Sequence, residues 1–159
     1  MKTVPGLLTS LSMNARGLWI RELSIDDYDR LIDLWDRSAL PYKPHGRDAR
    51  ERIARELQGP SAIFLVAEID GELVGSVLGT HDGRKGWINR LCVAPEHRGN
   101  GIGRELVREV EERLEKLGIE IVTCLIETWN GGSMAFFAAL GYVRHDDIVY
   151  FSKRKGPEV

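Results

Sequence analysis

Residues 98–103 have the types and spacing of a site that binds an anion, Arg98-Gly99-Asn100-Gly101-Ile102-Gly103. They follow an apolar run that ends at Val93 and a turn at Pro95, and they lead into a stretch with helical spacing of apolar residues. Glycines leave the N–H groups at the start of a helix open to an oxygen-rich anion, and the helix dipole adds partial positive charge there. Arg98 adds a full charge beside the loop. We therefore predict that a pyrophosphate group binds here.

A glycine-rich loop alone does not identify the ligand, and two alternatives remain open. The loop could be a tight strand-to-helix turn that binds nothing. It could also bind a dinucleotide such as NAD, with Glu127 as the acidic residue after the next strand. Against this, the spacing is Gly-x-Gly-x-Gly rather than Gly-x-Gly-x-x-Gly, and three predicted strands precede the loop where a dinucleotide unit usually opens the domain. A P-loop is excluded because no Gly-Lys-Ser/Thr sequence follows.

A second group of residues, further along the chain, narrows the choice. It comprises Asn130, Ser133, Phe137, Gly141 and Tyr142. Together with the glycine loop, this group resembles the two signatures of the GCN5-related N-acetyltransferase (GNAT) superfamily, Arg/Gln-x-x-Gly-x-Gly/Ala and Asn-x-x-Ala-x-x-x-Tyr-x-x-x-Gly-Phe. The resemblance extends over residues 17–153, and within the superfamily the chain looks most like the YpeA-like branch.

The resemblance implies an N-acetyltransferase that moves an acetyl group from acetyl-CoA (coenzyme A) to a primary amine by direct attack on the thioester. The pantetheine arm of the cofactor would enter between two splayed strands. Backbone groups of Leu91 and Val93 would pair with the arm, and one of them would polarise the thioester carbonyl. For Phe136 and Phe137, plain core packing of one of the two is an equal alternative. The residues implied to bind the cofactor are Leu91, Cys92, Val93, Arg98, Gly99, Asn100, Gly101, Ile102, Gly103, Arg104, Asn130, Phe136 and Phe137.

The sequence departs from the family at the general acid. Many relatives have a tyrosine at the position of Phe137, and this tyrosine is thought to protonate the departing thiolate. Phenylalanine has no proton to give, and a general acid typically contributes a factor of about 10²–10⁴ in rate. Tyr142 is close in sequence, but it aligns with an apolar position and is expected to be packed. An acyl-CoA-binding regulatory domain with little or no turnover is therefore the alternative function.

The general base is also not obvious from the sequence. The strand before the loop offers Asn89, which could order a water molecule but is not a base. Glu127, at the end of the next strand, is the nearest carboxylate, so we name Glu127 and Asn89 as the catalytic candidates. His45, His81 and Asp82 are further candidates. We expect no acyl-enzyme at either cysteine and no metal.

The acceptor amine would bind at the proline-containing loop between the first two helices, where relatives build this site. Tyr42 and His45 are the substrate-binding candidates in that loop. Nothing in the sequence distinguishes a small-molecule amine from a lysine or the N-terminus of a protein.

The elements that must position these residues follow from hydrophobic periodicity and turn signals. The periodicity and turn signals, taken with the resemblance, predict an α+β fold with one mixed, mostly antiparallel sheet, a splayed parallel strand pair and about four helices. Ser24 is expected to cap the first helix, and Asp70-Gly71 and Asp82-Gly83 are expected to form hairpin turns. The expected strands are residues 17–23, 62–69, 72–80, 87–93 and 119–126, with one or two closing strands in 142–152; the expected helices lie within 25–37, 49–58, 102–117 and 132–140.

Composition limits the class of protein. The 159 residues carry a net charge of −2, so charge gives no argument for a nucleic-acid or membrane partner. No apolar run approaches the ~20 residues that span a bilayer. The two cysteines suit free thiols in a cytoplasmic protein. We expect a disordered extension over residues 1–16, with Met13 as an alternative start, and a single domain over 17–155. Relatives often form homodimers, although the sequence shows no dimer surface.

Overall fold

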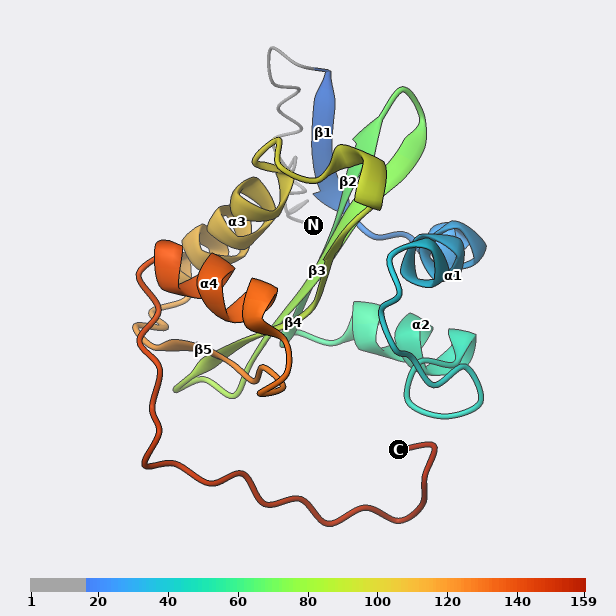
Figure 1. The fold of residues 1–159 in the computed structure, drawn as a ribbon. Coiled ribbons are helices and arrows are strands. Elements are labelled where there is room, and N and C mark those ends of the chain that lie inside the picture. The colour runs from blue at the N-terminus through green and yellow to red at the C-terminus, as the bar shows by residue number, and fades with distance from the viewer. Residues whose placement is uncertain (1–16) are drawn as a thin grey trace, which may run out of the picture.

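A computed structural model describes residues 17–159, and the extension expected over residues 1–16 lies outside this range. The described chain forms a five-stranded sheet in the order β1-β2-β3-β4-β5, with helices on both faces (Figure 1). Helices α1 and α2 cover one face, and α3 and α4 cover the other. None of the helices within residues 17–159 combines the length and apolar character needed to cross a membrane.

The sheet is mixed, as predicted. Strands β1 to β4 pair antiparallel, and β4 and β5 pair parallel. The Asp70-Gly71 hairpin is confirmed: both residues have positive φ, 49° and 80°, which the tight turn between β2 and β3 requires. The strands are β1 Leu18–Glu22, β2 Ala62–Ile69, β3 Glu72–His81, β4 Gly86–Val93 and β5 Val122–Cys124.

The helices begin and end close to their predicted positions. Ser24 caps the 3₁₀ turn that leads into α1, and its side chain forms a capping box with Asp27. Helix α1 buries Leu31, Leu34 and Trp35 against the sheet, because these residues share one helical face. The helices are α1 Tyr28–Arg37, α2 Arg50–Gln58, α3 Ile102–Lys116 and α4 Gly131–Ala139.

Three glycines allow α3 to pack very close to the sheet. A Cβ atom added at Gly79 would lie 2.4 Å from Cγ1 of Val110, and one added at Gly86 would lie 2.6 Å from Cδ1 of Leu114. At Gly75 the added atom would be 3.0 Å from Cδ1 of Leu106. Carbon atoms in ordinary contact are about 3.5–4.0 Å apart, so only glycine fits at these positions.

The parallel pair is shorter than expected. A strand was expected over residues 119–126, but β5 has only three residues and pairs with β4 from Gly86↔Val122 to Ile88↔Cys124. Beyond Ile88 the two strands diverge, so β5 loses the partner that would extend it. The last five residues of β4 therefore continue along the splayed side without a parallel neighbour.

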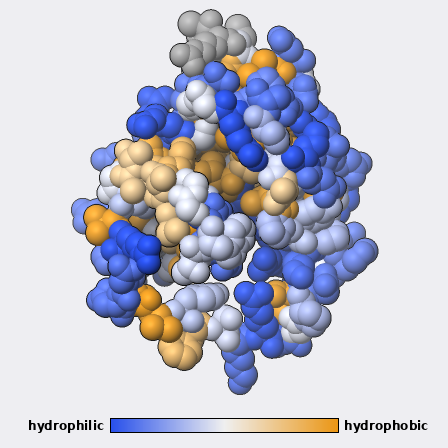
Figure 2. Space-filling model, viewed as in Figure 1, coloured by the Kyte–Doolittle hydropathy of each residue, from blue (hydrophilic) through white to orange (hydrophobic). Residues whose placement is uncertain are grey.

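The prediction of closing strands in residues 142–152 is wrong: the described chain forms none there. The segment instead crosses the molecule as an extended chain and reaches the loop between α1 and α2 (Figure 1), where Arg47 N–H donates to Glu158 O at 3.2 Å. Its composition favours extended backbone, but a strand also needs a neighbour to satisfy its N–H and C=O groups. The apolar side chains of this segment are exposed (Figure 2), namely Val143, Ile148, Val149, Tyr150 and Phe151.

Candidate active site

The glycine loop lies between the end of β4 and the start of α3. Gly99 and Gly101 have φ values of 77° and 81°, which L-residues with side chains rarely adopt. An added Cβ at either position would have no atom within 4 Å, so the space beside the loop is open. Gly101 directly precedes α3 and has no side chain to cap it, so the first N–H groups of the helix remain directed at the loop. This is the geometry expected of an anion cradle.

Arg98 lies at the mouth of this cradle and is exposed. Its Nε donates to Val93 O at 3.0 Å, and one terminal nitrogen is 3.4 Å from Ser38 O. Asn100 braces the loop, since its Nδ2 donates to His97 O at 3.2 Å. Arg98 therefore places a positive charge between the loop and the end of β4.

The backbone groups of Leu91 and Val93, the two positions named from the sequence, point toward the side of β4 where β5 diverges. Ala94 N–H donates to Val74 O of β3 at 2.8 Å. Because successive residues of a strand direct their backbone groups to opposite sides, Leu91 and Val93 direct theirs away from β3. That side is where β5 has already ended. The polar groups expected to bind the pantetheine arm thus border the space between the two strands.

Helix α4 lies next to the start of α3, with Phe136 beside Gly103. Asn130 caps α4, with its Oδ1 accepting from Ser133 N–H at 3.1 Å, so its amide NH₂ is the group left for a ligand. Phe136 is half-buried and adjoins Gly103, where an added Cβ would lie 3.3 Å from the ring. Phe137 is only 6% exposed. Of the two aromatic residues, Phe136 is the one beside the loop.

Tyr142 is partly buried and packs against the core, as predicted. Its ring packs edge-on against Phe137 with 5.0 Å between centroids, and its hydroxyl donates to Glu111 at 2.7 Å. Burial and this hydrogen bond raise the pKa of the tyrosine hydroxyl. A group with a raised pKa is a poor proton donor to a thiolate, so Tyr142 does not replace the missing tyrosine at position 137.

The candidate bases fall into two groups. Ile88 and Cys124 form the last pair between β4 and β5. Glu127 lies three residues beyond Cys124, just as Leu91 lies three residues beyond Ile88. Glu127 therefore reaches the part of the strand pair where the two strands have separated. Asn89 is exposed on β4, at the point where the strands diverge. The catalytic candidates Glu127 and Asn89 therefore belong to the same region.

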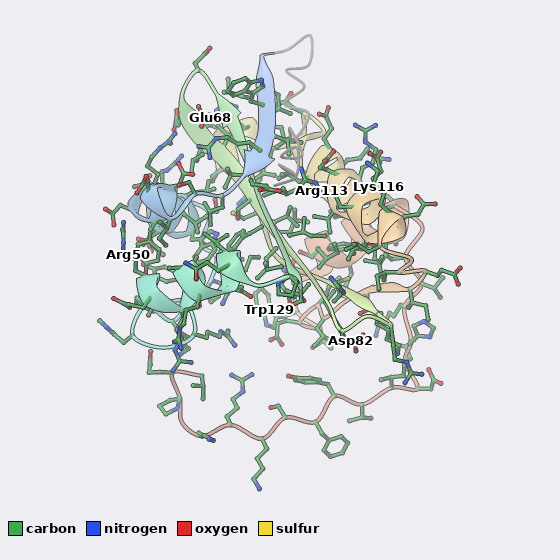
Figure 3. The ribbon with its side chains drawn as sticks, turned by 180° about the vertical axis from the view of Figure 1, so that it is seen from behind. Arg50, Glu68, Asp82, Arg113, Lys116 and Trp129 are labelled. Atoms are coloured by element: carbon green, nitrogen blue, oxygen red, sulfur yellow. The ribbon has the colours of Figure 1, made fainter. Side chains whose placement is uncertain are left out.

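His81 and Asp82 do not belong to this region. His81 ends β3, and Asp82 lies in the β3–β4 hairpin (Figure 3). This hairpin is at the opposite end of β4 from the glycine loop, roughly 25 Å away for an extended strand of this length. Asp82 accepts hydrogen bonds from Arg84 N–H and Lys85 N–H, which lower its pKa and give it a structural role in the turn. The Cys92 thiol is also unsuited to ionise, since burial raises its pKa.

The loop between α1 and α2 adjoins β4 on the other face of the sheet. Tyr42 packs against the buried Trp35 with 5.9 Å between ring centroids, and a hydrogen bond to Asp36 raises the pKa of its hydroxyl. His45 is exposed. Sequence reasoning missed Arg90. Arg90 binds Asp48 at 2.6 Å and Pro41 O at 2.6 Å, and the only sequence signal for it was an arginine inside an otherwise apolar strand.

A mixed sheet whose parallel pair splays beside a helix-opening glycine loop is the arrangement that the sequence resemblance implied for an acyl-CoA-dependent transferase. Comparison with known proteins agrees. The profile of the Acetyltransferase (GNAT) family matches residues 28–142. The chain is 37% identical over 136 residues to the acetyltransferase plu1384 of Photorhabdus laumondii and 33% identical over 135 residues to the acetyltransferase SG1711 of Sodalis glossinidius, covering 85% of this chain and 94% of the relative in each case.

Solved structures show the same fold. The PaiA N-acetyltransferase of Thermoplasma acidophilum, in complex with coenzyme A, has a TM-score of 0.74 at 24% identity over 82% of this chain and 92% of its own. The aminoglycoside acetyltransferase AAC(6')-Iy, in complex with a bisubstrate analogue, has a TM-score of 0.72 at 19% identity over 86% of this chain and 98% of its own.

The chain belongs to the GNAT family of acetyltransferases. It is an N-acetyltransferase, and acetyl-CoA is its acetyl donor. The alternative of a regulatory domain without turnover is not favoured, because the curated relatives are acetyltransferases.

Proposed function

We propose that acetyl transfer takes place in the gap between the ends of β4 and β5, with a primary amine as the acceptor. The observation that carries this proposal is the placement of two binding elements on one strand. Leu91 and the N–H of Val93 direct backbone polarity toward the gap, Val93 O accepts from Arg98 Nε, and the glycine loop begins a few residues further on. A ligand with a pyrophosphate at one end and an amide-rich arm can bind both at once.

Acetyl-CoA supplies a thioester that an amine can attack directly. The chain's residues bind and orient this group: the N–H groups of Gly101 to Gly103 and the guanidinium of Arg98 hold the pyrophosphate, with Arg104 nearby. The N–H of Leu91 or Val93 stabilises negative charge on the carbonyl oxygen during attack. Phe136, Cys92, Ile102 and the NH₂ group of Asn130 line the rest of the path.

The acceptor must lose a proton to attack. We propose that Glu127 takes this proton, directly or through a water molecule that Asn89 orders. Phe137 offers no proton to the departing thiolate, so that proton comes from solvent. The acceptor would approach from the loop that carries Tyr42 and His45.

The acceptor is best sought among small cationic amines. The neighbours of similar fold include a protein in complex with sisomicin, an aminoglycoside. Asp36 and Glu56 place carboxylates on or beside the α1–α2 loop, which suits an ammonium group. A thiol-release assay with sisomicin, spermidine and a lysine-containing peptide tests the class. We expect release with at least one of the two small amines, and release with the peptide alone would overturn this choice.

Cofactor binding is tested separately by thermal shift. A ligand that binds only the folded state stabilises it by about 2.7 kcal/mol at one hundred times its Kd. We expect a clear rise in Tm with coenzyme A and none with NAD. A rise with NAD and none with coenzyme A would refute the proposed site.

We further propose that the acetyltransferase domain spans residues 17–155, that the protein acts in the cytoplasm, and that two copies associate. The C-terminal segment supports the last point. It exposes five large apolar side chains, and Ile121 and Leu125 are exposed beside β5. If these side chains each bury roughly 100 Å², two copies together bury roughly 1,400 Å², within the range of about 1,200–2,000 Å² for stable interfaces.

Light scattering after size-exclusion chromatography tests the association. We expect a dimer for the wild type and a monomer for Phe151→Asp. Trp19→Asp, at the opposite edge of the sheet, is the matched control and should remain dimeric. A monomeric wild type would contradict the association without affecting the proposed chemistry.

A further inference from the structure

Arg90 lies at an irregular point of β4. Ser76 pairs with Cys92 and Leu78 pairs with Asn89, so two residues of β4, Arg90 and Leu91, lie opposite a single residue of β3. This arrangement is a β-bulge, and Arg90 has a φ of 54°, which is uncommon for a residue with a side chain. The bulge includes Leu91 and lies two residues before Val93, and the backbone groups of both residues border the gap.

Buried hydrogen bonds hold the bulge in place. Ser76 Oγ donates to Arg90 O at 2.8 Å and accepts from Trp35 Nε1 at 3.0 Å. Ser76 and Trp35 are fully buried. The backbone of Arg90 is therefore fixed from within the core, which also fixes the direction in which its side chain leaves the strand.

The side chain of Arg90 binds both ends of the loop between α1 and α2. One terminal nitrogen lies 2.8 and 2.6 Å from the two carboxylate oxygens of Asp48, and the other donates to Pro41 O at 2.6 Å. The guanidinium also lies over the Trp35 ring, 5.2 Å from its centre. The Arg90 and Asp48 side chains are only 13% and 8% exposed, so water screens their attraction weakly.

Asp48 in turn closes the loop on itself. Its Oδ2 accepts from Lys43 N–H at 2.7 Å, and its backbone oxygen accepts from the Tyr28 hydroxyl at 2.9 Å. Residues 41–48 are thus tied to α1, to each other and to β4. Within the described chain, the side-chain hydrogen bonds between residues 41–48 and β4 come from Arg90.

We propose that Arg90 is a positioning residue that sets the distance between the acceptor loop and the splayed end of β4, and so determines which amines fit. Its backbone directs the groups that border the gap, and its side chain fixes the loop that carries Tyr42 and His45. This inference rests on the proposed function in one respect, that the acceptor enters beside this loop.

The test compares Arg90→Gln with Arg113→Gln. Arg113 is a matched control because it also joins two elements by ion pairs, to Glu22 and Glu109, but lies on α3 (Figure 3), away from the loop. Hydrogen exchange of residues 40–48, coenzyme A affinity, and KM values for acetyl-CoA and for an accepted amine are measured. Arg90→Lys, which keeps the charge and one donor group, is included as the conservative variant.

For Arg90→Gln we expect exchange of residues 40–48 to become faster by about tenfold or more, a change that corresponds to about 1.4 kcal/mol. The KM for the amine should rise by a similar factor, while coenzyme A affinity and the KM for acetyl-CoA change by less than about twofold. Arg90→Lys should recover part of both effects. Arg113→Gln should change neither.

Three results would overturn the proposal. Unchanged exchange in residues 40–48 of Arg90→Gln would show that Arg90 does not hold the loop. Faster exchange with an unchanged amine KM, or an equal rise in both KM values, would show that holding the loop does not determine the acceptor. A wild type that accepts no amine would count against the proposed function instead, and the exchange result would still decide whether Arg90 anchors the loop.

Discussion

Replacing Gly79 with alanine should destabilise the protein more than any other single added methyl group at a glycine in the sheet. The new Cβ would lie 2.4 Å from Cγ1 of Val110, about 1 Å inside ordinary contact distance. Val110 cannot rotate away easily, because a β-branched residue in a helix has one strongly preferred rotamer. Helix α3 must therefore move away from β3 or hold a strained side chain.

The cost can be estimated from two opposing terms. Overpacking a core typically costs about 1–3 kcal/mol, while replacing glycine by alanine recovers about 0.4–1 kcal/mol by restricting the unfolded chain. The difference is about 0–2.6 kcal/mol, and the 2.4 Å approach, the closest among the sheet glycines, places Gly79→Ala in the upper part of this range, at roughly 1–2 kcal/mol. Such a loss lowers Tm by roughly 2–8 °C in a protein of this size. Because α3 carries the glycine loop at its start, coenzyme A affinity should fall as well.

Urea denaturation with a double-mutant cycle is the assay. Val110→Ala removes the colliding methyl group, so Gly79→Ala should cost less in that background than in the wild type. Gly132→Ala on α4 is the control, since its nearest neighbour would be Asn130 Oδ1 at 3.9 Å; it should be neutral or slightly stabilising. Additive effects of the two substitutions, or a loss below about 0.5 kcal/mol for Gly79→Ala, would refute the close-packing argument.

Three further predictions concern the site and its surroundings. Gly101→Ala places a side chain at a φ of 81°, so it should cost about 1–2 kcal/mol in stability and weaken coenzyme A binding by about tenfold, measured by calorimetry; unchanged affinity would contradict the anion cradle. Tyr142→Phe removes the hydrogen bond to Glu111 and should cost about 1 kcal/mol while leaving kcat within about twofold, whereas a large loss of kcat would identify Tyr142 as the acid. Burial raises the pKa of Glu56, so the folded state binds its proton more tightly than the unfolded state, and the stability contributed by this group falls as pH rises through the unfolded and then the folded pKa. Glu56→Gln should therefore raise the urea midpoint at pH 7, with the advantage lost near pH 4, and an equal effect at both values would disprove the assignment.

The features that could be predicted from sequence depend on residues close together in the chain. Ser24 caps its own turn, Asp70-Gly71 forms its own hairpin, and the glycine loop is identified by spacing alone. The resemblance to two family signatures then supplied the ligand. These features needed no knowledge of which elements are neighbours in space.

The missed features depend on such neighbours. The close packing at Gly79 can be inferred only when α3 is known to lie over it. Arg90 finds its partner 42 positions away, in a loop whose path cannot be read from periodicity. Residues 148–151 have the composition of a strand, but composition does not provide a strand to pair with.

The exposed C-terminal segment has a consequence for solubility. Ile148 to Phe151 is an apolar stretch of the kind that promotes aggregation when it is left exposed. It is flanked by Asp146 and Asp147 on one side and by Lys153, Arg154 and Lys155 on the other. Parallel, in-register stacking would place like charges together, whereas an antiparallel pair places the acidic end of one copy beside the basic end of the other. The flanking charges therefore oppose parallel, in-register fibres and favour antiparallel contacts between copies.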